Sequence, residues 1–106
     1  MYKVKFSDRA KHDILNITNY IINELKNTPA AIKLQQAIEK SKTTLELFPY
    51  SRAVYFTHPA LKREYHGFKV RSYMMFYYID EEKECVVISR VYHSKQNHES
   101  LLSKEQ

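Results

Sequence analysis

The sequence predicts an α+β domain in which a two-helix hairpin packs on one face of a small, curved, mostly antiparallel sheet. Three observations predict this class. An alternating strand pattern opens the chain, two amphipathic helix patterns follow with a short link between them, and three strand patterns joined by two tight turns lie toward the end. The predicted element order is therefore β-α-α-β-β-β, and the length of 106 residues predicts a single domain, residues 1–106.

A first strand is predicted over Tyr2–Phe6, where apolar residues alternate with two lysines. Ser7 is the predicted N-cap of the first helix, because its hydroxyl can accept a hydrogen bond from an N–H group of the first turn. Apolar residues then recur at steps of three and four and predict an amphipathic helix over Asp8–Leu25. His12 and Asp13 lie off this apolar stripe, and we interpret both as surface residues.

The second helix is predicted to have Thr28 as its N-cap and Pro29 at its first position, and to continue to Leu47. The short link between the two helices predicts an antiparallel hairpin. Pro49 ends the second helix because proline cannot continue it. The segment Arg52–Ala60 is interpreted as a loop with a short extended piece, since a His–Pro pair interrupts a β-forming run.

The remaining strands are predicted over Arg63–Val70, Tyr73–Ile79 and Cys85–Tyr92. The middle one is apolar on both faces, which is typical of a strand at the centre of a sheet. A charged turn, Asp80–Glu84, joins it to the last strand. The tail, Ser94–Gln106, is polar except for one leucine pair, and we expect it either to dock as a short helical turn or to stay mobile.

Alternation predicts which side chains share a face of the sheet. In the strand Arg63–Val70 it places His66 with Phe68 toward the helices, but a bulge at Gly67 would reverse His66, so the direction of His66 stays open. Strict alternation in the last strand groups four residues on one face, namely Val86, Ile88, Arg90 and Tyr92. His93 then falls on the opposite face from Arg90, unless the strand bulges or ends near Tyr92.

Composition and motifs exclude several classes of protein. The single cysteine, Cys85, cannot form an internal disulfide, and the chain opens without a signal peptide, so we predict a cytoplasmic protein. No apolar run reaches membrane-spanning length, and no membrane partner is expected. The sequence has no phosphate-loop, dinucleotide-binding, nucleophile-elbow or zinc-protease motif. His93 and His98 are too sparse a pair to predict a metal site, and no cofactor is predicted.

The charge of the chain favours an acidic partner. Its formal net charge is +5, which is compatible with nucleic acid, a membrane surface or an acidic protein as the partner. Outside the turn Asp80–Glu84, basic side chains far outnumber acidic ones between Arg52 and Lys95. We therefore expect a basic, tyrosine-bearing working surface on the sheet face away from the helices, of the kind that binds phosphates and stacks on RNA bases.

Several residues of this region are candidates for chemistry. Metal-free RNA cleavage needs a base, an acid and cations that stabilise the charged phosphorane, and His66 and His93 are candidates for the base and the acid. If the chain is a ribonuclease, the candidate catalytic residues are Arg63, Arg71, Arg90 and His93. Candidates for target binding are His66, Lys69, Tyr92 and Lys95. Each residue alone is more simply interpreted as a surface or packing residue, and only the combination favours function.

Five segments in this order resemble the RelE/ParE family of toxins from bacterial type II toxin–antitoxin systems. They are SDRAKHDILNITNYI, NTPAA, LELFPYSR, VRSYMMFYYID and VVISRVYHSKQN, and together with the opening strand they cover most of the chain. The resemblance implies a RelE/ParE-like fold and a small basic toxin that is held inactive by a co-expressed antitoxin. In that family, RelE-like members cleave mRNA in the ribosomal A site, whereas ParE-like members inhibit DNA gyrase and are not nucleases.

The helical hairpin and the SYMMFYYID and RVYH segments are more similar to the ParE-like branch, which implies inhibition of gyrase by binding. The family often has basic residues where this chain has His66 and Gly67, and an Asp where it has Asn97. These departures weaken the ribonuclease roles that the resemblance to RelE implies. Arg71, Arg90, His93 and Lys95 still fall on positions that are commonly basic or functional in the family. The alternatives are a RelE-like ribosome-dependent mRNA endonuclease and a degenerate member that only binds its antitoxin.

The resemblance also implies a partner protein. We expect the antitoxin to present a segment with acidic and apolar residues that adds a strand to a sheet edge or lays a helix in a groove, giving a toxin–antitoxin hetero-oligomer. The positive charge of this chain would speed that encounter in a salt-dependent way.

Overall fold

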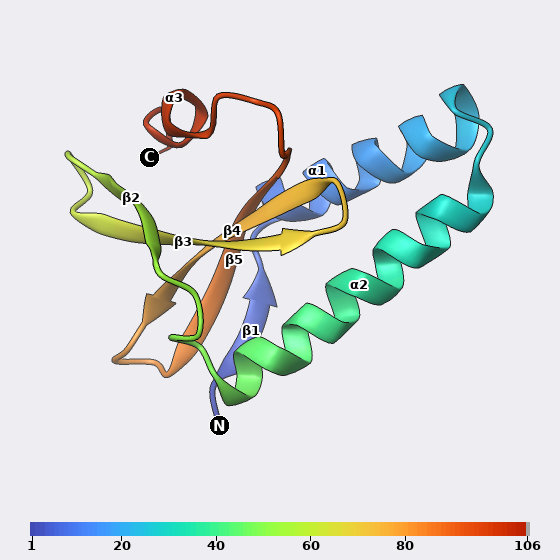
Figure 1. Cartoon of the computed structure of the whole chain (residues 1–106). Helices are drawn as coiled ribbons and strands as arrows, with labels where there is room; N and C mark the ends of the chain where they lie inside the picture. Colours follow the sequence, from blue (N-terminus) through green and yellow to red (C-terminus); the bar gives the residue numbers. More distant parts are fainter. Residues whose placement is uncertain (106) are drawn as a thin grey trace.

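A computed structural model describes residues 1–105 of the chain (Figure 1). Its elements in chain order are β1 (Lys3–Phe6), α1 (Asp8–Asn19), the π-helical turn η1 (Tyr20–Glu24), α2 (Thr28–Leu47), β2 (Val54–His58), β3 (Arg63–Val70), β4 (Tyr73–Asp80), β5 (Cys85–His93) and α3 (His98–Leu102). The strands form one sheet in the order β1-β5-β4-β3-β2. All neighbouring strands are antiparallel except β1 and β5, which are parallel.

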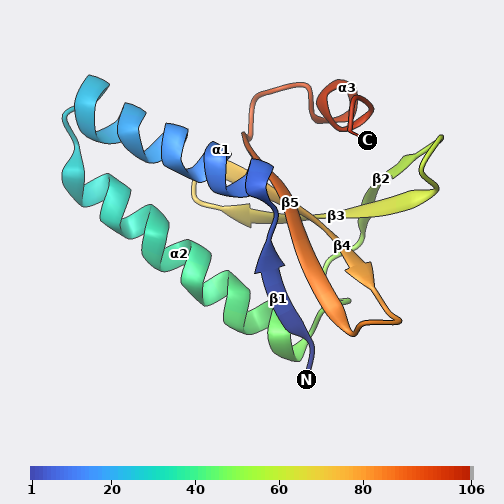
Figure 2. The same cartoon turned by 180° about the vertical axis from the view of Figure 1, so that it is seen from behind.

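This architecture confirms the predicted α+β class. Figures 1 and 2 show α1 and α2 as an antiparallel hairpin along one side of the sheet, while α3 lies near β2 on the other side. The segment Arg52–Ala60, interpreted as a loop with a short extended piece, contains the edge strand β2, whose residues Phe56–His58 pair with β3. The proline that argued against a strand follows the last paired residue, so it ends β2 without interrupting it.

The predicted hairpin is confirmed with two local corrections. Ser7 caps α1 as expected, since its hydroxyl accepts a hydrogen bond from the Ala10 N–H group at 3.1 Å. The N-cap of α2 is Asn27 and not Thr28, because the Asn27 side-chain oxygen accepts a hydrogen bond from the Ala30 N–H group. The first helix also changes winding at its end, where the Leu25 N–H group bonds to the Tyr20 carbonyl in η1.

The main core lies between the helical hairpin and the sheet. Its side chains come from both helices and from the strands, with Leu45, Met75, Tyr77, Val86 and Ile88 fully buried. A second, aromatic cluster lies on the opposite face and contains Tyr65, Phe76, Tyr92 and Leu102. The tail docks through α3 onto this second cluster, so the sheet face that we expected to be open is partly covered.

Two irregularities decide which way the strands present their side chains. On β5, Arg90 pairs with Phe76 and Ile88 pairs with Tyr77, so the residue between them, Ser89, is a bulge. The bulge turns Val91 toward the helices beside Ile88, and the predicted grouping of Val86 and Ile88 with Arg90 and Tyr92 is therefore wrong. His93 and Arg90 do lie on opposite faces, because His93 pairs with Tyr73 on the helix side.

The direction of His66 is settled by the pairing of β3. His66, Gly67 and Phe68 pair with consecutive residues of β4, so the strand has no bulge at Gly67. His66 consequently points toward the helices, where it is 6% exposed. The irregularity lies on the neighbouring strand β2, between Val54 and Phe56.

Two leucines near the end of α2 provide a test of this packing. Leu45 is fully buried, whereas Leu47 is 57% exposed. We expect Leu45→Ala to lower the free energy of unfolding by about 2–5 kcal/mol, because it opens a cavity between α2 and the sheet. Leu47→Ala should change it by no more than about 0.5 kcal/mol. Urea unfolding followed by circular dichroism measures both, and equal effects would contradict the packing described here.

Candidate functional site

Arg90 is held by two carboxylates from distant parts of the chain. Its Nε and Nη2 atoms donate to the two oxygens of Asp13 at 2.8 and 3.0 Å, a bidentate geometry, and Nη1 donates to Glu105 at 3.1 Å. The second Glu105 oxygen accepts from Arg9 at 2.9 Å. The Arg90 guanidinium also lies 4.7 Å from the centre of the Tyr92 ring.

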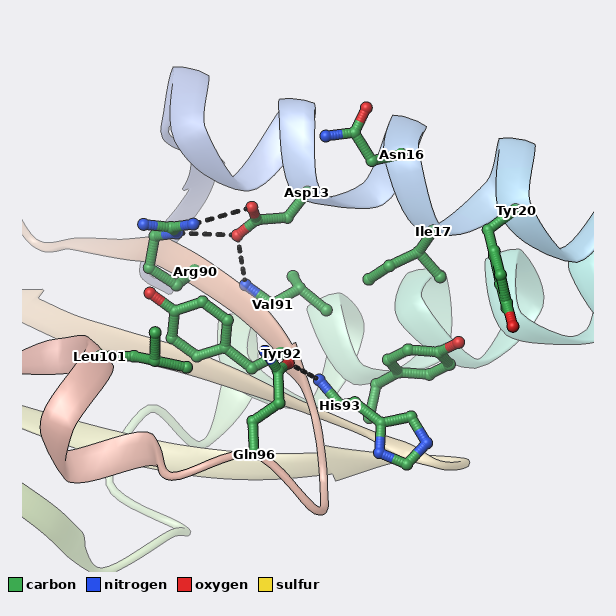
Figure 3. Close-up of a pocket in the computed structure, with 11 residues that line it drawn as sticks. Asp13, Asn16, Ile17, Tyr20, Arg90, Val91, Tyr92, His93, Gln96 and Leu101 are labelled. Carbon is green, nitrogen blue, oxygen red and sulfur yellow. Dashed lines mark hydrogen bonds and ion pairs between the residues drawn. The ribbon is translucent and has the colours of Figure 1, made fainter.

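Asp13 was wrongly interpreted as an unengaged surface residue. Strand β1 pairs with β5 only as far as Phe6 and Ile88, so the next part of the β5 edge has no strand partner. There the Asp13 carboxylate accepts a hydrogen bond from the Val91 N–H group at 2.9 Å, in addition to those from Arg90 (Figure 3). Asp13 thus ties α1 to β5 where the sheet edge would otherwise be bare.

The surroundings of Arg90 shift two pKa values. The hydrogen bonds that Arg90 donates to Asp13 raise the pKa of Arg90 above its ordinary value, so Arg90 stays charged. Burial raises the pKa of Tyr92 to about 12, an effect that the adjacent Arg90 partly opposes. Burial also raises the pKa of Tyr77, on the opposite face, to about 12. Both phenols are therefore neutral near physiological pH.

His93 lies at the mouth of a cleft of about 470 Å³ between α1 and the end of β5. Figure 3 shows Asn16, Ile17 and Tyr20 projecting from α1 and η1 over the strand that carries Val91 and His93. The Nδ1 atom of His93 accepts a hydrogen bond from the Lys95 N–H group at 3.1 Å. In the neutral ring the proton is therefore on Nε2, which leaves a donor at the cleft.

Arg71 lines an adjoining cleft of about 410 Å³, which it shares with His93, Tyr73 and Tyr20. It is the first residue of the two-residue turn between β3 and β4, and its φ of 55° is left-handed. Glycine is ordinarily found at such a position, since side chains disfavour this conformation. Arg71 and His93 thus line the same cleft.

Arg63 lies at the opposite end of β3 from Arg71, and His66 lies in the middle of that strand. The Arg63 guanidinium stacks 3.9 Å from the centre of the Tyr78 ring, and His66 stacks on Tyr77 with 5.0 Å between ring centres. The Nδ1 atom of His66 lies 2.7 Å from the Arg52 carbonyl and donates to it. Arg63 and His66 line a third cleft, so the predicted catalytic cations do not converge on one point.

The other predicted target-binding residues are also dispersed. Lys69 and Lys95 are exposed, Lys69 on β3 and Lys95 after β5, whereas Tyr92 is 6% exposed within the aromatic cluster. The sequence reasoning missed Tyr20, which was counted only as part of the first helix, and Glu105 in the polar tail. Neither residue carries a local signal, because each acquires its role from residues far away in the chain.

Residues 1–105 contain neither a metal-binding cluster nor a membrane-spanning helix. No group of three His, Cys, Asp or Glu side chains in that range is arranged to hold a metal ion. No helix there is both long and apolar enough to cross a bilayer.

A helical hairpin packed on a five-stranded mixed sheet is the architecture of the RelE/ParE fold class. A family model described as "ParE toxin of type II toxin-antitoxin system, parDE" matches residues 4–98, and the chain belongs to this family. The chain is thus the toxin of a type II toxin–antitoxin system. A search of curated protein sequences finds no match.

Solved structures of the same class share the fold. The chromosomal ParDE system of Pseudomonas aeruginosa aligns with a TM-score of 0.67 and 14% identity over 88% of this chain and 96% of that chain. A RelBE complex of Mycobacterium tuberculosis aligns with a TM-score of 0.58 and 22% identity over 87% and 96%. The isolated Escherichia coli RelE toxin aligns with a TM-score of 0.60 and 16% identity over 92% and 88%.

The carboxylate of Asp13 can be tested by Asp13→Asn. The substitution removes the charge that faces Arg90 and one of the oxygens that accept its hydrogen bonds. We expect the free energy of unfolding to fall by about 2 kcal/mol, the scale of a hydrogen bond to a charged group. Glu39→Gln on the exposed side of α2 is the matched control and should cost no more than about 0.5 kcal/mol. Equal values in urea unfolding would contradict the structural role of Asp13.

The two raised tyrosine pKa values predict a loss of stability at high pH. In the unfolded chain both phenols titrate near 10.0, whereas in the folded chain they hold their protons to about 12. The unfolded state is therefore the more deprotonated one in this window, and stability should fall as pH rises from 10 to 12. The slope from each tyrosine is at most about 1.4 kcal/mol per pH unit. Urea unfolding at several pH values should show a shallower fall in a Tyr77→Phe, Tyr92→Phe double variant, and an unchanged slope would contradict the assignment.

Proposed function

We propose that the chain is a ParE-like toxin that stops growth by binding and inhibiting DNA gyrase, and that a cognate antitoxin neutralises it in the cytoplasm. The observation that carries this proposal is the dispersal of the cations required for RNA cleavage. Arg63 and Arg71 lie at opposite ends of β3, and Arg90 is engaged by Asp13 and Glu105. Metal-free cleavage requires these cations to surround one phosphate, whereas inhibition by binding has no such requirement.

An antitoxin partner is supported by the open edge of the sheet. Strand β2 is an edge strand, and its residues Val54 and Tyr55 are 44% and 46% exposed. An edge of this kind accepts an added strand from another protein, and apolar side chains beside it accept apolar partners. Similar solved structures include RelBE toxin–antitoxin complexes, which is the assembly proposed here. With a net charge of +5, this chain would attract an acidic antitoxin segment and form a hetero-oligomer with it.

The experiment expresses the chain alone and together with the small open reading frame beside its gene. Purified chain is then assayed for inhibition of gyrase supercoiling and, in parallel, for cleavage of ribosome-bound mRNA. We expect growth arrest only without the neighbouring gene, inhibited supercoiling and intact mRNA. Full growth of cells that express the chain alone would reject the proposed growth arrest and leave the degenerate family member that only binds its antitoxin.

A RelE-like endonuclease remains the second candidate, favoured by the Nε2 donor of His93 beside Arg71. This candidate predicts that the wild-type chain cleaves mRNA and that the His93→Ala variant leaves it intact. Under the gyrase proposal, the same variant should leave mRNA intact because the wild-type chain already does so. Cleavage by wild-type chain without inhibition of supercoiling would overturn the gyrase proposal.

A further inference from the structure

The two clefts around His93 adjoin each other, because three residues line both. They share Tyr20, Tyr73 and His93, and each is large enough for a small ligand at about 470 and 410 Å³. The first is bounded by α1 and the end of β5. The second is bounded by η1, the beginning of α2 and the turn between β3 and β4. We call the combined space the His93 cleft.

Two backbone irregularities place side chains in this cleft. Tyr20 begins the π-helical turn η1, and Arg71 has a left-handed φ of 55° without being a glycine. π-Helical turns and left-handed non-glycine residues each cost conformational energy and often mark functional sites. Here both occur at residues that line the same cleft, although one lies in the helical hairpin and the other in the sheet.

The walls of the cleft are aromatic and its floor is apolar. Tyr20 is 53% exposed, and Tyr73 packs edge-on against His93 with 5.3 Å between ring centres. Burial, and to a lesser degree the Tyr20 phenol, raises the pKa of Tyr73 above its ordinary value. Ile17, Ile21 and Leu34 complete the floor.

The charged groups of the cleft favour an anion. Within residues 1–105, Arg71 has no carboxylate partner in an ion pair, so its cation is available to a ligand. His93 offers an Nε2 donor, because Nδ1 accepts from Lys95. The single carboxylate lining the two clefts in that range belongs to Asp13, which is already engaged by Arg90 and Val91.

We propose that the His93 cleft binds a nucleoside monophosphate, with the base against the rings of Tyr20 and Tyr73 and the phosphate at Arg71 and His93. An aromatic wall beside an unpaired cation matches a ligand with a flat ring at one end and an anion at the other. Stacking of a base on an aromatic side chain contributes about 1–3 kcal/mol. This site goes beyond the proposed function, since binding to gyrase does not require a nucleotide.

A free nucleotide and the 5′-terminal nucleotide of a nucleic-acid strand both offer a base and a phosphate of this kind. The test therefore titrates the purified full chain with AMP, adenosine, inorganic phosphate and a short 5′-phosphorylated oligonucleotide, followed by calorimetry and by histidine and tyrosine NMR signals. We expect saturable binding of AMP, with adenosine and phosphate each at least tenfold weaker. Tighter binding of the oligonucleotide identifies a strand end as the ligand, and equal or weaker binding identifies the free nucleotide.

Two pairs of variants separate the site from general effects. Arg71→Asn removes the cation but keeps a residue that tolerates a left-handed φ, and Lys62→Asn does the same at a φ of 56° outside the cleft. Tyr20→Ala removes the stacking wall, and Tyr50→Ala removes a ring of equal exposure, 54%, elsewhere. We expect Arg71→Asn to weaken AMP at least tenfold and adenosine little. Tyr20→Ala should weaken both, and the two controls should weaken neither.

Several results would overturn the nucleotide site. The first is the absence of saturable AMP binding up to about 10 mM. The second is binding of inorganic phosphate as tight as that of AMP. The third is an AMP affinity that neither Arg71→Asn nor Tyr20→Ala changes. Melting curves verify that each variant is folded. Gyrase supercoiling is assayed on the same preparations. Inhibition of gyrase without binding of AMP would reject this inference alone. Binding of AMP without inhibition of gyrase would reject only the proposed target.

Discussion

The bulge at Ser89 of strand β5 is the constraint on which the rest of the structure depends. Strand β5 pairs with β1 on one side and β4 on the other, so its side chains contribute to both faces of the sheet. One extra residue reverses the alternation halfway along it. Val91 and His93 consequently face the helices, while Arg90 reaches Asp13, Glu105 and the Tyr92 ring. Without the bulge, Arg90 would point into the apolar core and His93 would leave its cleft.

The elements of the fold could be predicted from the sequence because their signals are local. The apolar stripes of the hairpin, the cap at Ser7 and the doubly apolar strand β4 each depend on neighbouring residues. The bulge could not be predicted, since Ser89 is neither glycine nor proline and only the pairing with β4 reveals it. Strand β2 was predicted only as a short extended piece of a loop, for the opposite reason. Its local signal was present, but the proline after it was given too much weight.

The candidate site was harder to predict because its contacts join residues far apart in the chain. Asp13 and Arg90 are separated by 77 positions, and Arg9 and Glu105 by 96. Counting cations along the sequence therefore overestimated the basic surface. An arginine held in a bidentate pair with a carboxylate has lost most of the charge that a phosphate would meet. Of the three arginines proposed for catalysis, Arg90 is part of the scaffold, Arg63 stacks on Tyr78, and Arg71 lines the His93 cleft.

The ion pairs of Arg90 also explain why the cleft beside them favours an anion. Asp13 lies at its edge and would repel a phosphate if its charge were free. Because Arg90 and the Val91 N–H group already occupy both Asp13 oxygens, that repulsion is cancelled at the point where His93 and Arg71 provide donors. The same contact anchors α1 to β5, and η1 follows α1 directly, so the anchored helix determines where Tyr20 lies. A single ion pair thus serves both to close the edge of the sheet and to leave the charge of the adjacent cleft positive.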